Sequence, residues 1–209
     1  MFPAPRCGIF IVLIIYYNRF NNKKRKYIMT TWKIDPVHSE IIFKVKHLMI
    51  STVSGRFDTF DAAIETTKED FSDAKITFSG DVNSINTKNE MRDGHLKSPD
   101  FFDAAKYPAL SFTSTSVKKL SDYEMEVTGN LTMRGVTKSV KLAVIYNGTV
   151  AGMGGAKVAA FEITGKVNRF DFGLQWNALT EAGGVTVGNE VKIEILAEFN
   201  QVQEAAKAA

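Results

Sequence analysis

Apolar and polar residues alternate along most of the chain that follows Trp32. The alternation is centred on eight segments, at 41–45, 60–64, 76–82, 110–113, 123–133, 136–146, 159–167 and 191–199. A period of two is typical of β-strands that bury one face and expose the other to water. Most of these segments are long for strands, and the pattern therefore predicts an all-β fold.

The connections between the segments carry turn residues. Turn residues at 147–148 and 152–155 are expected in one connection, and Gly183-Gly184 in another. Residues 47–52 and 90–97 break the alternation and predict short helical turns, and 100–108 predict a loop that contains Phe101 and Phe102. Regularly spaced strands with few helical gaps favour an antiparallel sandwich or barrel.

Eight amphipathic strands must each hide one face, and closing their sheet into a barrel also removes its edges. We therefore expect an eight-stranded antiparallel barrel with one or two short helical segments. Six phenylalanines fall on the apolar positions of the strands: Phe43, Phe60, Phe78, Phe112, Phe161 and Phe199. The interior of such a barrel holds either packed side chains or one small ligand. Two interpretations stay open, a self-filled core and an apolar chamber for a lipid.

Charge is distributed unevenly along the chain. The whole sequence has 26 Lys and Arg, 23 Asp and Glu, and a net charge of +3. Residues 1–28 contain six of the bases and no acid, so the remaining chain has a net charge of −3. Binding to phosphate backbones needs a clustered cationic surface, and this balance argues against a nucleic-acid partner.

The two ends of the chain are expected to lie outside the barrel, which we place at 29–200. The apolar run at 8–17 is shorter than the roughly 20 residues that span a bilayer, so no stable membrane span is expected. We interpret 1–28 as a non-native upstream leader and Met29 as the true start, which would place the protein in the cytoplasm. The alternative is an interfacial anchor, because basic residues follow the apolar run. Residues 201–209 are expected to form a frayed tail.

Catalytic and metal chemistry find little support in the sequence. Cys7 is the single cysteine, and the three histidines are widely spaced, which argues against a disulfide or a zinc site. No nucleophile elbow, phosphate-binding loop or nucleotide fingerprint is present. His38 precedes Ser39, but no third group has a recognisable place beside them. We therefore expect no catalytic residue, no metal and no cofactor.

Arg169 lies in a sharp turn at 168–173, where a strand ends. One interpretation is an ion pair with Asp171 that fastens a loop to the rim of the barrel. The other is a guanidinium that binds the polar head of a ligand, since its fork of donors suits phosphate.

Several motifs occur together and in a fixed order. They are Ile34-Asp35-Pro36-x-His38-Ser39, Phe43-x-Val45-x-His47-Leu48, Gly55-x-Phe57, Arg92-Asp93-x-His95-Leu96-x-Ser98-x-Asp100-Phe101-Phe102, Tyr107-Pro108, Gly129-x-Leu131-Thr132-x-Arg134-Gly135-Val136-Thr137 and Asn168-Arg169-x-Asp171-Phe172-Gly173. Over about residues 31–200, the chain resembles the YceI family of polyisoprenoid-binding, lipocalin-like proteins. The resemblance implies an extended lipocalin-like barrel whose cavity holds a long isoprenoid or another lipid tail. Many members carry secretion signals, so a periplasmic location is the alternative to the cytoplasm.

The resemblance favours the chamber, and we expect non-enzymatic storage, transport or sequestration of an isoprenoid or similar long-chain lipid. The expected wall residues are Phe43, Phe78, Phe112, Leu131, Met133 and Phe161, and the expected mouth residues are Phe172 and Trp176. The candidates for binding the head group are His38, Arg92 and Arg169. An enzyme acting on a lipid-like substrate, a structural barrel acting through protein partners, and a homodimer stay open.

Overall fold

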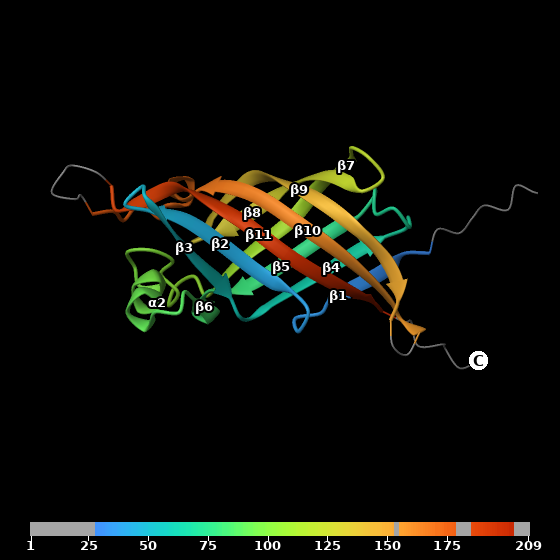
Figure 1. The fold of residues 1–209 in the computed structure, drawn as a ribbon, viewed down its shortest axis with the longest axis horizontal. Coiled ribbons are helices and arrows are strands. Elements are labelled where there is room, and N and C mark those ends of the chain that lie inside the picture. Colours follow the sequence, from blue (N-terminus) through green and yellow to red (C-terminus); the bar gives the residue numbers. More distant parts are fainter. Residues whose placement is uncertain (1–27, 153–154, 179–184, 203–209) are drawn as a thin grey trace, which may run out of the picture.

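The computed structural model describes residues 28–152, 155–178 and 185–202 (Figure 1). The predictions for 1–27, for 203–209 and for the turn at 183–184 lie outside these residues. The strands are β1 Thr30–Ile34, β2 Glu40–His47, β3 Ser51–Phe57, β4 Phe60–Thr66, β5 Lys75–Asp81, β6 Ile85–Asn86, β7 Ala109–Lys119, β8 Glu124–Met133, β9 Val136–Ala151, β10 Lys157–Asn168 and β11 Val187–Gln201. The helices are α2 Glu90–Lys97 and the 3-10 helices η1 Val82–Ser84 and η3 Arg169–Phe172.

The strands form one closed antiparallel barrel. Neighbouring strands run in the order β1-β4-β5-β7-β8-β9-β10-β11, and β1 pairs with β11 to close the ring. Strand β2 pairs with β11 and β3, and β3 pairs with β6. Strands β2, β3 and β6 therefore repeat the neighbour order of β1, β4 and β5 beside β11. The closed ring itself contains eight strands. The predicted eight-stranded antiparallel barrel is confirmed.

The local predictions succeed where the alternation or a helix cap is clear. The connection expected to begin at 147–148 is wrong there, because β9 continues to Ala151 and accommodates these residues at an irregularity in its pairing with β10. Helix α2 occupies the predicted residues 90–97, and the side chain of Asn89 caps it by accepting the backbone N–H of Arg92. The predicted helical turn at 47–52 is wrong, because these residues form the tight hairpin between β2 and β3. Leu48 and Met49 adopt positive φ angles of 51° and 60° there, and the backbone N–H of Ile50 donates to the carbonyl of His47. An apolar Leu-Met-Ile run lacks the glycine or asparagine that normally indicates such a turn.

The barrel has two structurally different ends. Helix α2, the β2–β3 hairpin, the β8–β9 turn and the β10–β11 connection lie at one end, which we call the α2 end (Figure 1). The β4–β5, β7–β8 and β9–β10 connections lie at the other end, which we call the β4–β5 end. Inward-facing side chains from the strands form the hydrophobic core between the two ends.

Candidate functional site

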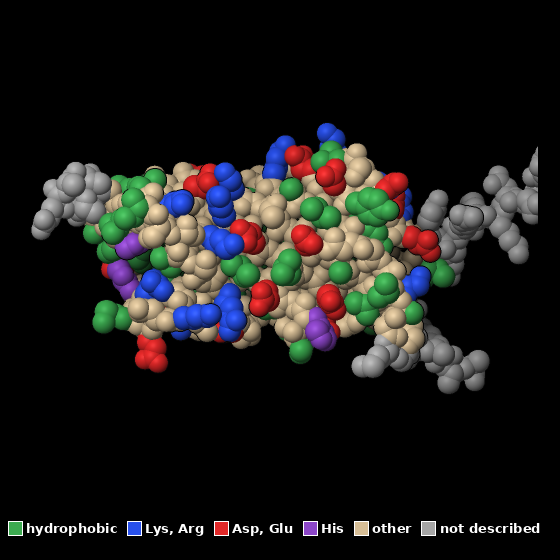
Figure 2. Space-filling view, in the orientation of Figure 1, with side chains coloured by type: hydrophobic (Ala, Val, Ile, Leu, Met, Phe, Trp, Pro, Cys, Tyr) green, Lys and Arg blue, Asp and Glu red, His purple; other side chains and the backbone are tan. Residues whose placement is uncertain are grey.

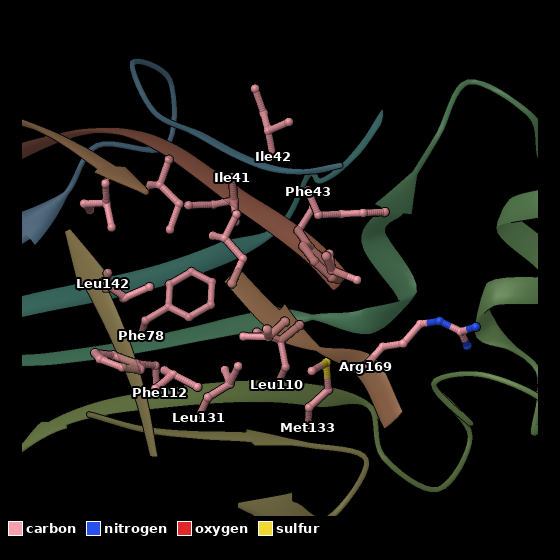
Figure 3. Close-up of a pocket in the computed structure, with 18 of the residues that line it drawn as sticks. Ile41, Ile42, Phe43, Phe78, Leu110, Phe112, Leu131, Met133, Leu142 and Arg169 are labelled. Atoms are coloured by element: carbon pink, nitrogen blue, oxygen red, sulfur yellow. The ribbon is translucent and has the colours of Figure 1, made fainter. Parts of the chain in front are cut away.

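An apolar cavity of about 220 Å³ lies inside the barrel. Its walls come from strands around the whole ring, and Figure 3 shows Phe78, Phe112 and Leu131 converging on it. Among the described residues that line it, Arg169 is the only one with a polar side chain. We call this cavity the chamber.

Five of the six predicted wall residues line the chamber: Phe43, Phe78, Phe112, Leu131 and Met133. Their positions follow from the strand period, because each occupies the inward parity of its strand. Phe112 and Leu131 are paired directly across β7 and β8, and Phe78 and Phe112 are paired across β5 and β7. A contiguous apolar wall results on this side of the barrel.

Glycines on the wall leave room for three of the bulky side chains. A Cβ atom added to Gly55 would overlap the ring of Phe43, and one added to Gly129 would overlap the ring of Phe112. At Gly165, an added Cβ would lie 2.5 Å from the Cδ2 atom of Leu142. The missing side chains let these groups lie against the wall instead of across the chamber.

Phe161, the sixth predicted wall residue, is not part of the chamber lining. Its ring packs edge-on against Phe71 at 5.1 Å and lies 5.4 Å from the ring of Tyr146 and 5.9 Å from that of Phe199. Phe71 belongs to the β4–β5 connection and is also 5.3 Å from the ring of Trp32. These five side chains form an aromatic plug at the β4–β5 end. The alternation predicts that Phe161 faces inward, but it does not say how far along the barrel axis the side chain lies.

Hydrogen bonds hold Phe71 in the plug by fixing the connection that carries it. The Asp73 carboxylate accepts the hydroxyls of Thr66 and Thr67 at 2.5 Å each and the backbone N–H of Thr67 at 3.2 Å. Desolvation raises the pKa of Asp73, but these hydrogen bonds outweigh it and lower the pKa to about 2. The carboxylate is therefore ionised at neutral pH and accepts all three bonds.

The α2 end of the chamber is covered by side chains outside the regular barrel strands. Leu96 from α2, Phe101 and Phe102 from the loop after it, and Leu174 from the β10–β11 connection all contribute to the lining. Phe102 also packs edge-on against Phe57 at 6.2 Å. Aromatic rings thus border the chamber at the β4–β5 end, and side chains from a helix and loops border it at the α2 end.

Arg169 organises the covering segments at the α2 end. Its side chain is 4% exposed, and its guanidinium donates to the carbonyls of Gly188 at 2.9 Å, Leu174 at 2.5 Å, Trp176 at 2.8 Å and Val187 at 3.2 Å. Burial lowers the pKa of Arg169, yet a guanidinium stays charged at neutral pH. The partners of this side chain are backbone carbonyls and not Asp171. Four of its five N–H donors are therefore engaged in holding the β10–β11 connection.

The other two candidates for binding a head group lie in separate hydrogen-bond networks. His38 is exposed outside the chamber, with its Nδ1 atom 3.0 Å from the Asp35 carboxylate, and this hydrogen bond raises the pKa of His38. Arg92 donates to the hydroxyl of Thr87 at 2.7 Å and to its carbonyl at 2.8 Å, which ties α2 to the segment before it. The structure does not bring His38, Arg92 and Arg169 together.

The two predicted mouth residues occupy different positions near the α2 end. Trp176 belongs to the β10–β11 connection and packs against α2 and the loop after it. Its ring lies 4.7 Å from that of His95 and 5.3 Å from that of Phe101. Phe172 is 1% exposed and packs in the core without lining the chamber. Leu96, Phe101 and Leu174, which cover the chamber, were not among the predicted site residues. The apolar pair Phe101-Phe102 in an otherwise polar loop was the signal for this cover.

Within 28–152, 155–178 and 185–202, the structure offers no cluster of three or more His, Cys, Asp or Glu side chains that could hold a metal ion. Among the same residues, no helix is long and apolar enough to cross a membrane. The described chamber lining contains no acid, histidine or hydroxyl side chain. The lining is therefore apolar, with one buried cation at its end, four of whose five N–H donors bond to backbone carbonyls.

Comparisons with known proteins agree on one family. The family model of the YceI-like domain matches residues 32–199. A UPF0312 protein of Staphylococcus aureus is 42% identical over 173 residues, which are 82% of this chain and 98% of that protein. The crystal structure of a Campylobacter jejuni YceI protein is 31% identical, with a TM-score of 0.66 over 76% of this chain and 90% of that one.

A more distant structure shares the fold. It is a polyisoprenoid binding domain from Saccharophagus degradans, 17% identical, with a TM-score of 0.56 over 82% of this chain and 98% of that chain. The barrel architecture is therefore common to proteins of widely different sequence.

Proposed function

Because the chain belongs to the YceI-like family, we propose that it binds a polyisoprenoid or a similarly long apolar chain in the chamber, without catalysing a reaction on it. The observation that carries this proposal is the lining, which is apolar except for Arg169. The likeness to a polyisoprenoid binding domain supports the class of ligand. The absence of acid, base and nucleophile from the described lining favours binding over catalysis on a lipid-like substrate.

Apolar burial supplies the binding energy in this proposal. Each methylene moved from water into the chamber contributes about 0.8 kcal/mol. A protein cavity of about 150 Å³ takes up benzene, so a cavity of about 220 Å³ has room for roughly nine carbon atoms by proportion. A longer chain therefore needs side chains to move or one of its ends to leave the chamber.

The α2 end is where a longer chain would extend. Phe43 and Phe112 already lie against glycines, so their rings leave little further room at the wall. The aromatic plug closes the β4–β5 end with rings held by strands and by the bonded β4–β5 connection. By contrast, Leu96 and Phe102 belong to a helix and a loop, and loops open at lower free-energy cost than sheet cores. We infer that the tail occupies the chamber and that the polar end of the ligand emerges beside α2.

A pair of tryptophan variants tests the proposal. Leu131→Trp adds a large side chain on the inward face of β8, and Asn130→Trp adds the same side chain one residue away on the outward face. Overpacking a filled core costs about 1–3 kcal/mol, whereas an empty chamber absorbs much of the added volume. We expect Leu131→Trp to stay folded and to lose binding of a dansyl-labelled farnesyl chain, while Asn130→Trp binds it like the wild type.

The readouts are fluorescence titration, together with mass spectrometry of solvent extracts from each purified protein. Equal binding by the two folded tryptophan variants would show that the ligand lies outside the chamber. Failure of the stripped wild-type protein to bind any apolar chain would also overturn the proposal.

A further inference from the structure

Several apolar side chains are exposed at the α2 end of the barrel. At the β2–β3 hairpin, Leu48, Met49 and Ile50 are 40%, 59% and 84% exposed, and Met91 on α2 is 87% exposed. We call these four residues the apolar rim. Figure 2 shows hydrophobic side chains gathered at this end. Exposing them to water is unfavourable, and an unpaired apolar patch often marks an interaction surface.

Lysines lie directly below this rim on the outer surface. Lys44 on β2 is paired across the sheet with Lys192 on β11, which is paired in turn with Lys166 on β10. Lys46 lies two residues closer to the hairpin and is exposed. We call these four residues the lysine belt, and a band of basic side chains crosses the same region in Figure 2.

The lysine belt costs stability in the folded barrel. Like charges placed directly opposite each other on neighbouring strands repel. Glu194 and Glu190 relieve part of this repulsion by pairing with Lys44 and Lys166. Within the described residues, no ion pair to Lys46 or Lys192 is formed. An arrangement of this kind is suited to a partner that brings negative charge from outside.

Charge distinguishes the two ends of the barrel. At the α2 end, residues 42–56 around the hairpin contain three bases and no acid, and residues 88–106, which hold α2 and the loop after it, contain four bases and four acids. Residues 58–73, which include β4 and part of the β4–β5 connection, contain six acids and one base. Apolar side chains such as Leu120, Tyr123 and Val150 are exposed at the β4–β5 end as well. Exposure alone therefore does not select an end, but an anionic surface attracts the α2 end and repels the acidic one.

The spacing of rim and belt fits a lipid surface. Lys46 and Lys44 precede Leu48 by two and four residues, which corresponds to about 7–13 Å along a strand. Apolar groups of interfacial proteins insert about 5–10 Å into the boundary between headgroups and acyl chains. With the rim inserted to that depth, Lys44 and Lys46 lie near the level of the phosphates.

We propose that the α2 end docks on an anionic lipid membrane, with the apolar rim inserted and the lysine belt against the headgroups. The inference rests on the proposed function, because this orientation turns the cover of the chamber toward the membrane. An apolar chain then passes between bilayer and chamber without crossing bulk water.

The test compares two charge variants of the full chain that remove the same number of lysines. Lys46→Gln with Lys192→Gln depletes the belt, and Lys75→Gln with Lys157→Gln removes two exposed lysines near the β4–β5 end. Co-sedimentation is measured with vesicles of phosphatidylcholine and with vesicles of phosphatidylcholine and phosphatidylglycerol. A third variant, Met49→Ser with Ile50→Ser, removes apolar area from the rim.

A lysine near an anionic membrane contributes about 1 kcal/mol, so the belt variant should lose roughly thirty-fold in partitioning to the anionic vesicles. The matched control should partition like the wild type, and added salt should weaken wild-type binding. The rim variant should also bind the anionic vesicles less tightly. Residues 1–28 are the same in every protein, so any contribution from them cancels in the comparison.

Binding of the dansyl-labelled farnesyl chain without vesicles is measured in parallel, to separate the two proposals. If the belt and control variants partition equally, the docking proposal fails while chamber binding stands. If the chamber binds no chain but the belt still governs vesicle binding, the proposed function fails and the docking surface stands. Belt-dependent binding of single-stranded DNA without binding of vesicles would identify the belt as a nucleic-acid site and overturn the proposal.

Discussion

Substituting glycine by alanine should have opposite effects on stability at Gly55 in β3 and at Gly94 in α2. A Cβ atom at Gly55 would overlap the ring of Phe43 and approach the methyl group of Thr87, whereas nothing lies within 4 Å of a Cβ at Gly94 in α2. Gly55→Ala should destabilise the protein by about 1–3 kcal/mol and turn the ring of Phe43 into the chamber. Gly94→Ala should stabilise it by up to about 1 kcal/mol, because alanine is the better helix former.

Denaturant unfolding and ligand titration of both variants measure these effects. Adding Phe43→Leu to Gly55→Ala should restore part of the lost stability, since the overlapping ring atoms are gone. If Gly55→Ala is neutral for both stability and ligand binding, the glycine does not shape the chamber.

Alanine variants of Phe78 and Phe161 distinguish a side chain that lines the chamber from one that packs in a filled core. Phe161 contacts three other rings in the aromatic plug, and Phe161→Ala should cost about 3–5 kcal/mol with or without ligand. Phe78 lines the cavity, so its removal enlarges an existing space instead of opening a new one, and Phe78→Ala should cost clearly less in the stripped protein. The cost of Phe78→Ala should increase when ligand is present, because binding to the folded state adds stability by mass action. Equal losses of about 4 kcal/mol for both variants in stripped protein would make Phe78 an ordinary core residue.

The sequence predicts which side chains of a strand face the barrel interior. It does not predict how far along the barrel axis each side chain lies, or whether it lines a cavity or packs in a filled core. Phe43, Phe112 and Phe161 all follow the same inward parity, yet the first two line the chamber and the third fills the plug. Arg169 was predicted either to fasten a loop or to bind a head group. The structure gives it four carbonyl partners that come from residues 174–188, and no local pattern in the sequence indicates them.

Among the elements, the β4–β5 connection should respond to acid. The pKa of Asp73 is lowered from 3.8 to about 2 in the folded protein, so its carboxylate favours folding above about pH 4. That contribution should fall as the pH drops from 4 toward 2, when the carboxylate becomes protonated in the folded state as well. Asp73→Asn should reduce stability at neutral pH, and its difference from the wild type should shrink over this interval.

Urea unfolding at several pH values measures this effect. Asp171→Asn, which changes an exposed carboxylate at the α2 end, should stay within about 0.5 kcal/mol of the wild type at neutral pH. If the difference between Asp73→Asn and the wild type is unchanged down to pH 2, the hydrogen bonds to Asp73 do not hold the connection in solution.

Strict alternation predicted most of the long strands, and the pattern failed where it was weak. Strand β3 has Gly55 in place of an apolar side chain on its inward face, and β6 has only two residues. The hairpin at 47–52 was taken for a helical turn because its apolar residues are not typical turn formers. Long-range pairing decides such segments, and a local pattern does not contain that information.

At the scale of the whole molecule, closure of the barrel was predictable and the arrangement of charge was not. Eight amphipathic strands indicate a closed sheet, as the structure has. The net charge of −3 over residues 29–209 is a sum over both ends of the barrel, and it led to the prediction that the surface has no basic cluster. Lys44, Lys166 and Lys192 are far apart in the sequence, and only the register of β2, β11 and β10 places them side by side.

Native mass spectrometry tests the central claim most directly, namely that the chamber holds a long apolar chain. The full-length protein is stripped of lipid, incubated with geranylgeraniol and transferred intact to the gas phase. The account predicts a complex with one ligand for each folded chain, present in wild type and Asn130→Trp and lost in folded Leu131→Trp. A wild-type spectrum that contains only the mass of the free protein, or a complex that persists in Leu131→Trp, would contradict it.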